Sequence, residues 1–174
     1  DDGPVLAKRD YYIGPDEYIS ALLQKVNCIT EDLAFSLYRE MAAGELVIRE
    51  QDDNKASYTW RRRPEDGLIN WKDSSRRIYN LIRAVSHPFP GAFAYLHDQK
   101  IKIWRSSLVK GLKLNRRAEP GTIIGPGRDG ILVSTLDYCL EITEIQVADG
   151  MILSGEGLKE KLLPCTGERF GGPR

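Results

Sequence analysis

A rigid corner near the middle of the chain, SHPFPGAFAYL at residues 86–96, constrains the fold more than any other stretch. Each proline fixes its own φ at about −65° and drives the preceding residue toward extended geometry. Pro88 therefore stops a preceding helix, and Gly91, directly after Pro90, lets the chain turn at once. The aromatic and aliphatic residues that follow alternate with alanine, which is typical of a strand. The corner thus predicts a junction between a helix and a β-rich region.

Helical periodicity precedes the corner in two places. Apolar side chains recur at steps of three and four over residues 18–41, which predicts one long helix that ends at Gly44. The alternative is a break at CITED, with Thr30 as the N-cap of a second helix. A shorter helix is predicted to begin at an N-cap among residues 73–75 and to stop at Pro88. Its buried face is expected to comprise Ile78, Leu81, Ile82 and Val85.

Alternating apolar runs predict strands on both sides of these helices. Residues 4–13 are expected to form one strand, and residues 44–60 two short strands around a polar turn at residues 52–55. After the corner, about five short strands separated by Gly, Asp and Pro turns are typical of a small barrel or sandwich. These strands are expected within residues 92–109, 121–135 and 137–149.

The composition narrows the class of protein. A chain of 174 residues forms one domain or two small ones, and 41% hydrophobic with 29% charged residues is ordinary for a protein that buries a core. No apolar run approaches the roughly 20 residues that span a bilayer, and the first residues do not resemble a signal peptide. No membrane association is therefore expected.

The cysteines argue against disulfides and against a metal site. Cys28, Cys139 and Cys165 are odd in number and widely spaced, unlike a disulfide framework or a set of zinc ligands. They predict a reducing, cytoplasmic compartment. Charge is balanced at 25 basic and 25 acidic residues, but residues 1–70 carry a net −5 and residues 71–174 a net +5. That excess is far from the dense basic stripe of a strong nucleic-acid binder.

Two segments around the corner resemble the domain junction of the folate-dependent formyltransferases. They are DGLINW at residues 66–71 and RRIYNLIRAVSHPFPGAFAYLHDQKIKIW at residues 76–104. The family includes methionyl-tRNA formyltransferase and the sugar-nucleotide formyltransferases, such as the UDP-aminoarabinose enzyme. The resemblance implies an α+β fold. Residues 1–69 would form the C-terminal end of a Rossmann-like formyltransferase domain, and residues 70–174 a linking helix and a small OB-like β-barrel.

The resemblance also implies a catalytic residue. In the family an Asn-x-His motif meets an aspartate from a later Asp-x-Gly-x-Ile/Val turn. The opening DDGPVLAK is similar to that turn, which places the catalytic aspartate at Asp1 and the turn glycine at Gly3. The chain contains no Asn-x-His motif, and neither His87 nor His97 matches the catalytic histidine. The chain thus resembles the C-terminal half of such an enzyme and is expected to be inactive alone.

The chemistry of formyl transfer explains this expectation. An amine attacks the formyl carbon of 10-formyltetrahydrofolate, and imidazolium and amide donors stabilise the oxyanion that forms. A carboxylate beside them keeps the imidazole charged and helps to remove the amine proton. The folate is expected to bind mainly to residues upstream of Asp1. Without the resemblance, Asp1 would be interpreted as a solvated carboxylate in a turn.

Two arginines are candidates for substrate binding. In WRRRPEDG, Arg61, Arg62 and the following proline match an Arg-Arg-x-Pro-acidic pattern in the sugar-nucleotide branch of the family. Arginine binds phosphate through paired hydrogen bonds, so this match implies contacts with a nucleotide-linked aminosugar. The alternative is an exposed segment in which these arginines pair with Glu65 and Asp66.

Other patterns leave the function open. The glycine-rich residues 123–131 lack the Lys-Ser/Thr ending and the following helix of a phosphate-binding loop, so a hairpin turn is expected there. The modest positive charge favours the aminosugar substrate over tRNA, with methionyl-tRNA formyltransferase as the first alternative. The second alternative is a non-catalytic OB-like module that binds nucleic acid or protein. Its stacking surface would consist of Tyr95, Lys100, Lys102 and Trp104.

Overall fold

The computed structural model describes residues 3–113 and 118–171. The chain divides into two compact units, Asp1–Arg62 and Arg63–Arg174, which are described separately below. The domain boundary inferred from the sequence, between residues 69 and 70, stays a prediction. No helix in the described part of the chain is both long enough and apolar enough to cross a bilayer.

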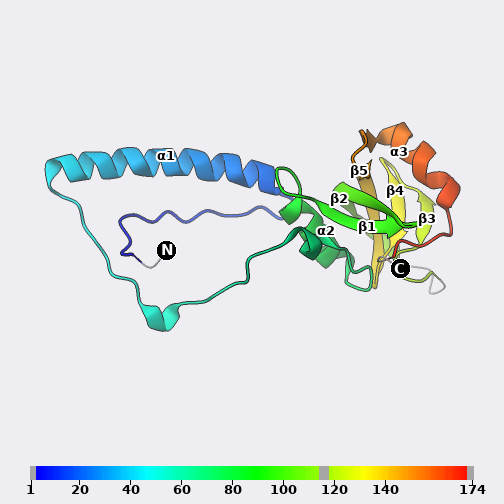
Figure 1. Ribbon diagram of the computed structural model, residues 1–174, viewed down its shortest axis with the longest axis horizontal. Helices are drawn as coiled ribbons and strands as arrows, with labels where there is room; N and C mark the ends of the chain where they lie inside the picture. Colours follow the sequence, from blue (N-terminus) through cyan, green and yellow to red (C-terminus); the bar gives the residue numbers. More distant parts are fainter. Residues whose placement is uncertain (1–2, 114–117, 172–174) are drawn as a thin grey trace. The chain divides into compact units, whose positions relative to one another are not determined.

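The first unit contains one long helix, as the periodicity predicts. Helix α1, Ile19–Ala43, runs unbroken (Figure 1) and ends at Gly44, whose φ of 73° is left-handed. The N–H of Gly44 donates to the carbonyl of Met41 at 3.1 Å, which satisfies one of the last carbonyls of the helix. Thr30 does not cap a second helix, because its hydroxyl donates to the Val26 carbonyl within α1 at 2.8 Å.

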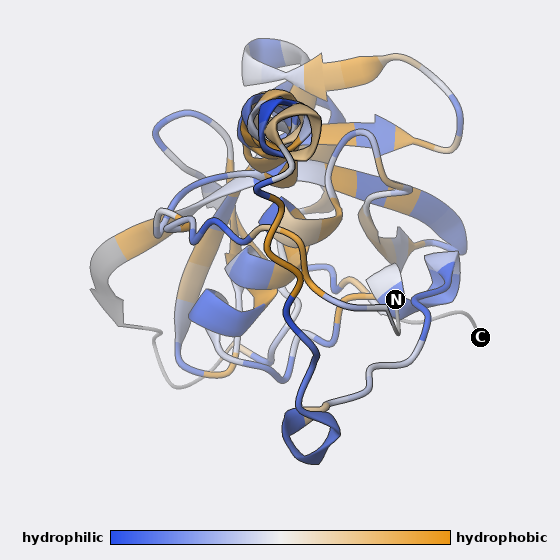
Figure 2. Cartoon of the chain, turned by 90° about the vertical axis from the view of Figure 1, so that its left-hand side faces the viewer, coloured by the Kyte–Doolittle hydropathy of each residue, from blue (hydrophilic) through white to orange (hydrophobic). Residues whose placement is uncertain are grey.

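The strands predicted in the first unit are wrong. In its described residues the two extended segments meet in one isolated antiparallel pair, Val5 and Arg49. A strand needs a neighbour along its length, and neither segment has one beyond this pair. The predicted polar turn forms a single 3₁₀ turn, η1 (Asp53–Lys55), which is hydrophilic throughout in Figure 2.

The second unit begins with a 3₁₀ turn, η2 (Pro64–Gly67), and continues into helix α2, Ser75–Val85. The hydroxyl of Ser74 caps α2 by accepting from the N–H of Arg77 at 3.3 Å, within the range of N-caps predicted from the sequence. Ile78 and Ile82 are buried as predicted, whereas Leu81 and Val85 are only partly buried. Tyr79, which the sequence did not single out, completes the buried face.

A six-stranded antiparallel sheet forms the body of this unit (Figure 1). Its strands pair in the order β1-β2-β5-β4-β3, and β6 pairs with the far end of β5. A third helix, α3 (Gly155–Leu162), follows β6, leads into η3 (Leu163–Cys165), and buries Leu158 and Leu162 completely. The strands are β1 (Ala92–Leu96), β2 (Gln99–Lys113), β3 (Ile123–Pro126), β4 (Ile131–Ser134), β5 (Tyr138–Val147) and β6 (Ile152–Ser154).

Side chains from these strands build the core. Strand β3 alternates between buried and exposed residues, as a half-buried strand should, whereas β1 and β5 bury several consecutive residues. The largest fully buried side chains of the strands are Ile101, Ile103, Ile123, Ile131, Leu140, Ile142 and Ile145. Ile78 and Ile82 of α2 belong to the same fully buried set.

The predicted OB-like barrel is not closed by strand pairing. Strands β1 and β3 lie at opposite ends of the strand order, and residues 168–171 bridge them instead. Gly171 exchanges two backbone hydrogen bonds with Tyr95 of β1, and Arg169 pairs with Thr122 beside β3. Phe170, between these bridges, is buried and stacks on Trp71 with 5.4 Å between ring centroids. The strands predicted from the sequence ended at residue 149, so neither β6 nor the bridging segment was foreseen.

The corner at residues 86–96 packs against strand β2. Gly91 has a φ of 89°, and a Cβ there would lie 2.7 Å from the ring of Trp104. The N–H of Gly91 donates to the Val85 carbonyl at 2.9 Å, and the Ser86 hydroxyl donates to the Trp104 carbonyl at 3.1 Å. The end of α2 and the middle of β2 are therefore joined through the corner, as the junction prediction requires.

We predict that Gly91→Ala lowers the free energy of unfolding by about 2–5 kcal/mol. A left-handed residue with a Cβ costs roughly 1–2 kcal/mol, and overpacking against the Trp104 ring adds roughly 1–3 kcal/mol. Urea denaturation followed by tryptophan fluorescence measures the change. The matched control is Gly157→Ala in α3, where a Cβ meets Leu153 at an ordinary 3.8 Å. That variant should be unchanged or gain up to about 1 kcal/mol; equal losses in both variants would refute the corner's role.

A carboxylate distant in sequence completes the cap of α2. Asp137, between β4 and β5, accepts a hydrogen bond from the N–H of Ser75 at 2.7 Å. It also accepts from the hydroxyl of Thr135 at 3.0 Å and from the N–H of Tyr138 at 2.9 Å. Partial burial opposes ionisation, but these hydrogen bonds outweigh it and hold the pKa of Asp137 below its ordinary value.

Asp137→Ala should lower the free energy of unfolding by about 0.5–2 kcal/mol at pH 7, the usual range for loss of a helix cap. Because the folded-state pKa is depressed, this stabilisation is complete above the unfolded pKa of about 3.9 and is lost as pH falls through the folded pKa. Denaturation curves from pH 7 to pH 3 should therefore converge for the two proteins. Asp129→Ala, which removes an exposed carboxylate from the β3–β4 turn, is the control; a pH-independent difference for Asp137→Ala would contradict the cap.

Candidate functional site

The turn expected to carry the catalytic aspartate lies at the start of the first unit. Asp1 itself is outside the described residues, so its side chain is not placed. The chain directly after it is held in two places. The N–H of Val5 donates to the Arg49 carbonyl at 2.8 Å, and the side-chain amide of Gln51 donates to the Gly3 carbonyl at 2.7 Å. The candidate turn is thus joined to a segment almost fifty residues away.

A partly buried carboxylate anchors the next part of this segment to α1. Glu17, whose side chain is 9% exposed, accepts from the Tyr11 hydroxyl at 2.6 Å and from the Lys25 ammonium at 2.7 Å. Lys25 also donates to the Tyr11 oxygen at 2.7 Å. Hydrogen bonds from Lys25, Tyr11 and the N–H of Gly14 lower the pKa of Glu17 to about 2, and the same pair raises the pKa of Lys25 to about 12. Both groups therefore stay charged at neutral pH.

The candidate substrate arginines, Arg61 and Arg62, lie exposed at the end of the first unit. Within the described chain neither guanidinium has a hydrogen-bond or ion-pair partner. Asp66 does not pair with them, because its carboxylate accepts from the N–H of Arg63 at 2.7 Å and caps η2. Trp60, beside them, is 97% exposed. Both guanidinium groups can therefore accept an anionic ligand without first breaking an internal bond.

Both histidines lie in the second unit and contact other parts of it. His87, in the corner, stacks on Trp104 with ring centroids 3.7 Å apart. His97, in the β1–β2 turn, contacts the Glu168 carboxylate at 2.5 Å and has a φ of 51°. Both contacts connect the sheet to its neighbouring segments.

The glycine-rich turn at residues 127–130 joins β3 to β4, as the hairpin prediction requires. Its backbone N–H groups are occupied by a carboxylate of this chain. Glu141, on β5 and 6% exposed, accepts from the N–H groups of Asp129 at 2.7 Å and Gly130 at 2.9 Å. Its second oxygen accepts from the Ser107 hydroxyl at 3.1 Å. The N–H groups of Asp129 and Gly130 are therefore not available to a phosphate.

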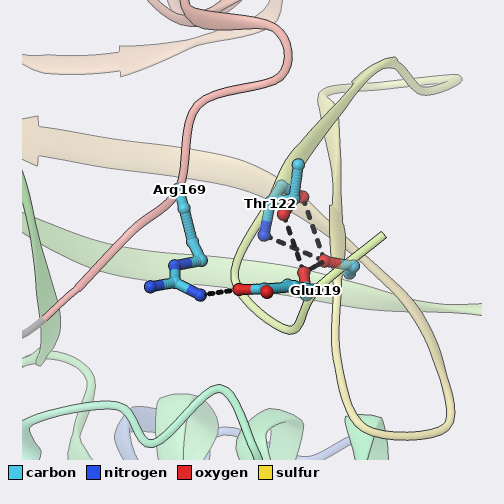
Figure 3. Close-up of polar contacts among 4 residues, drawn as sticks. Glu119, Thr122 and Arg169 are labelled. Carbon is cyan, nitrogen blue, oxygen red and sulfur yellow. Dashed lines mark hydrogen bonds and ion pairs between the residues drawn. The ribbon is translucent and has the colours of Figure 1, made fainter. Parts of the chain in front are cut away.

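A polar network fixes the segment that bridges the sheet edges (Figure 3). The Arg169 guanidinium pairs with the Glu119 carboxylate, and the Thr122 hydroxyl donates to the Glu119 carbonyl at 2.7 Å. The Ser134 hydroxyl accepts from the N–H of Thr122 at 2.9 Å. These contacts tie residues 119–122, β4 and the bridging segment together. Their role is structural, since each group is satisfied within the unit.

The surface expected for base stacking is largely covered. Trp104 is 3% exposed, with His87 on its ring and Gln146 accepting from its indole N–H at 3.2 Å. Lys102 pairs with Asp149 at 3.3 Å, and Lys100 lies over the Phe93 ring at 3.8 Å. Tyr95 is partly buried. Trp104 therefore offers no ring for a nucleic-acid base in this arrangement.

No candidate metal site appears among the described residues, where no three His, Cys, Asp or Glu side chains are grouped suitably. All three cysteines are free, and burial raises the pKa of the Cys139 and Cys165 thiols. Two open surface depressions occur in the first unit, of about 560 and 820 Å³. Charged and polar side chains line much of both, with Phe35 in one and Tyr58 in the other.

Sequence reasoning missed two residues that shape these candidate sites. Gln51 contacts Gly3 through an antiparallel register between distant segments, and no local pattern signals such a contact. Glu141 lies in a strand at a position that faces inward. A charged residue at such a position usually has an internal partner, and this was the signal that could have identified it. Both side chains bind backbone groups, and the residue types nearby in the sequence do not indicate such contacts.

The comparisons with known proteins agree with the resemblance at the domain junction. A multiply substituted variant of HypX from Aquifex aeolicus matches with a TM-score of 0.69 and 16% identity, over 100% of this chain and 30% of that one. HypX from Aquifex aeolicus in complex with tetrahydrofolic acid matches with a TM-score of 0.68 and 16% identity, over 99% of this chain and 32% of that one.

Identity at this level shows the fold alone, and the chain spans about a third of the length of these structures. The family description matches the sequence directly. A model named formyl transferase, C-terminal domain, matches residues 61–162, which cover the 3₁₀ turn η2, helix α2, all six strands and helix α3. More than half of the chain lies within this match, and the chain therefore belongs to the formyl transferase C-terminal domain family.

Proposed function

We propose that the chain is the C-terminal portion of an N-formyltransferase that moves a formyl group from 10-formyltetrahydrofolate to the amine of a nucleotide-linked aminosugar. The match of residues 61–162 to the family carries the proposal. The HypX structure that holds tetrahydrofolic acid supports a folate donor. In this proposal the donor binds mainly to residues upstream of Asp1.

In this proposal residues 1–69 complete a Rossmann-like domain. Helix α1 has no buried residue although its sequence is amphipathic, and Phe35, Tyr38 and Met41 are 60–74% exposed. A helix of this kind gains most of its stability from packing its apolar face against other elements. The rest of the Rossmann-like domain would supply that cover.

The proposed role of Asp1 follows from the chemistry of acyl transfer to an amine. The amine nitrogen bonds to the formyl carbon, the bond from that carbon to the donor nitrogen breaks, and the amine loses a proton. The Asp1 carboxylate would keep the histidine of an upstream Asn-x-His motif charged and help to accept that proton. The exposed, unpaired guanidinium groups of Arg61 and Arg62 would bind the substrate diphosphate.

The first test uses the intact protein with its upstream sequence, which should contain an Asn-x-His motif. Incubation with 10-formyltetrahydrofolate and either UDP-aminosugars or aminoacylated initiator tRNA identifies the acceptor, with formylated product measured by mass spectrometry. Asp1→Asn, which keeps the size but removes the charge, should lower kcat by at least about 100-fold, the scale of a lost general acid–base group. Formylation of tRNA alone would reject the aminosugar proposal, and absence of the motif would reject the enzyme proposal.

The second test separates substrate binding from chemistry. The double variant Arg61→Ala, Arg62→Ala should raise the KM for the nucleotide substrate about tenfold or more, because each charged hydrogen bond contributes roughly 1.5–3 kcal/mol. The KM for the folate should stay the same. Arg128→Ala, which removes an exposed arginine from the β3–β4 turn, is the control. An unchanged KM for the nucleotide substrate in the double variant would show that these arginines do not bind it.

A further inference from the structure

Two aromatic side chains beside the candidate arginines are almost wholly exposed. Tyr58 is 93% exposed and Trp60 is 97% exposed, the highest values among the large apolar and aromatic side chains of the described residues. Within that part of the chain neither ring stacks on another ring or forms a hydrogen bond. Trp71 and Trp104, by contrast, are buried. Both exposed rings are therefore available to a ligand.

The rings lie on a run of chain, residues 56–63, that forms no helix, strand or turn. The backbone is extended at its two ends, with ψ of 138° at Ala56 and 160° at Arg63. An extended chain advances at most about 3.3–3.6 Å per residue, so the Cα atoms of Tyr58 and Trp60 are no more than roughly 7 Å apart. Both side chains are thus within reach of a single flat ring system.

The next residues along the chain complement the charge of a nucleotide. Arg61 and Arg62 are exposed and have no partner in the described chain. In a nucleotide a single ribose separates the base from the first phosphate. A base stacked on Trp60 would therefore place its phosphates near these guanidinium groups, which bind phosphate through paired hydrogen bonds. Aromatic rings beside basic residues are the combination by which proteins hold bases and their phosphates together.

The polar neighbours of the rings favour a nucleotide over a protein partner. Ser57 and Thr59 line an open depression of about 820 Å³ together with Tyr58, and their hydroxyls can both donate and accept hydrogen bonds at the edge of a base. The cores of protein–protein interfaces are depleted of charged residues, whereas here the arginines at residues 61–63 follow the rings directly. A nucleotide supplies an apolar face and negative charge in one molecule.

We propose that Tyr58 and Trp60 bind the nucleobase of the substrate by stacking, while Arg61 and Arg62 bind its phosphates. The inference rests on the proposed function and extends it from the phosphates to the base. Stacking tolerates any base, because every base has a π face. The rings therefore contribute affinity for nucleotides in general and discriminate weakly between one base and another.

The experiment measures binding to the intact protein by isothermal titration calorimetry, with UDP and inorganic pyrophosphate as probes. Trp60→Ala should raise the Kd for UDP about 5- to 100-fold, the usual effect of removing one stacking ring, and leave the Kd for pyrophosphate within about twofold. Tyr58→Ala should show the same selectivity, and Trp60→Phe should retain most of the affinity for UDP. Tyr12→Ala, which removes another exposed aromatic ring of the first unit, is the control and should bind both probes as the wild type does.

Two results would overturn the inference. One is a wild-type protein that binds UDP no more tightly than pyrophosphate. The other is a Trp60→Ala variant that keeps its affinity for UDP, or that loses affinity for both probes together with thermal stability, since the ring would then pack against protein. Because binding is measured without turnover, the proposed function is tested separately. Tight, ring-dependent binding of UDP without formylation of any UDP-aminosugar would reject the proposed function and leave the base site standing.

Discussion

The contact between the Gly91 backbone and the Trp104 ring holds the second unit together. A side chain at position 91 cannot fit, so the corner can lie flat on the ring and bring the end of α2 against the centre of β2. Strand β2 pairs with both β1 and β5, and β5 pairs with β4 and β6. Asp137 joins the start of α2 to the β4–β5 connection. The helix is thus attached to the sheet at both ends, by a steric fit at one and a carboxylate cap at the other.

Elements that depend on contacts between residues close in sequence were predicted correctly, whereas those that depend on distant partners were not. Helix α1 depends on periodicity and on a glycine at its C-terminal end, both local, and it was predicted almost to its last residue. The strand expected at residues 4–13 was wrong, because a strand exists only through a partner and Val5 alone is paired. Closure of the sheet by residues 168–171 was missed for the same reason. Gly121, Tyr95 and their partners in that segment are far apart in sequence.

The residues of the candidate site also fall into those identifiable from local sequence and those that depend on distant contacts. Arg61 and Arg62 were identifiable from an arginine-proline-acid pattern, and their exposure is a local property of an extended segment. Gln51 was not identifiable, because its contact with Gly3 depends on a register between segments 48 residues apart. The role of Glu141 was not apparent from the alternating pattern of its strand. Its hydrogen bonds to the N–H groups of Asp129 and Gly130 occupy donors that an anion would otherwise use. Local patterns thus identified the candidate arginines, whereas contacts between distant segments became visible only in the structure.

The bridging segment 168–171 has a consequence for the behaviour of the protein in solution. Unpaired edge strands are templates on which sheets of different molecules join, and many proteins protect such edges with short covering segments. Here one stretch of four residues binds to β1 through Tyr95 and to the residues beside β3 through Thr122, so it shields part of both edges at once. Its buried Phe170 keeps it in place. Residues 168–171 therefore shield backbone groups at both edges, and removing them would leave the pairing positions at Tyr95 and Thr122 open to another molecule.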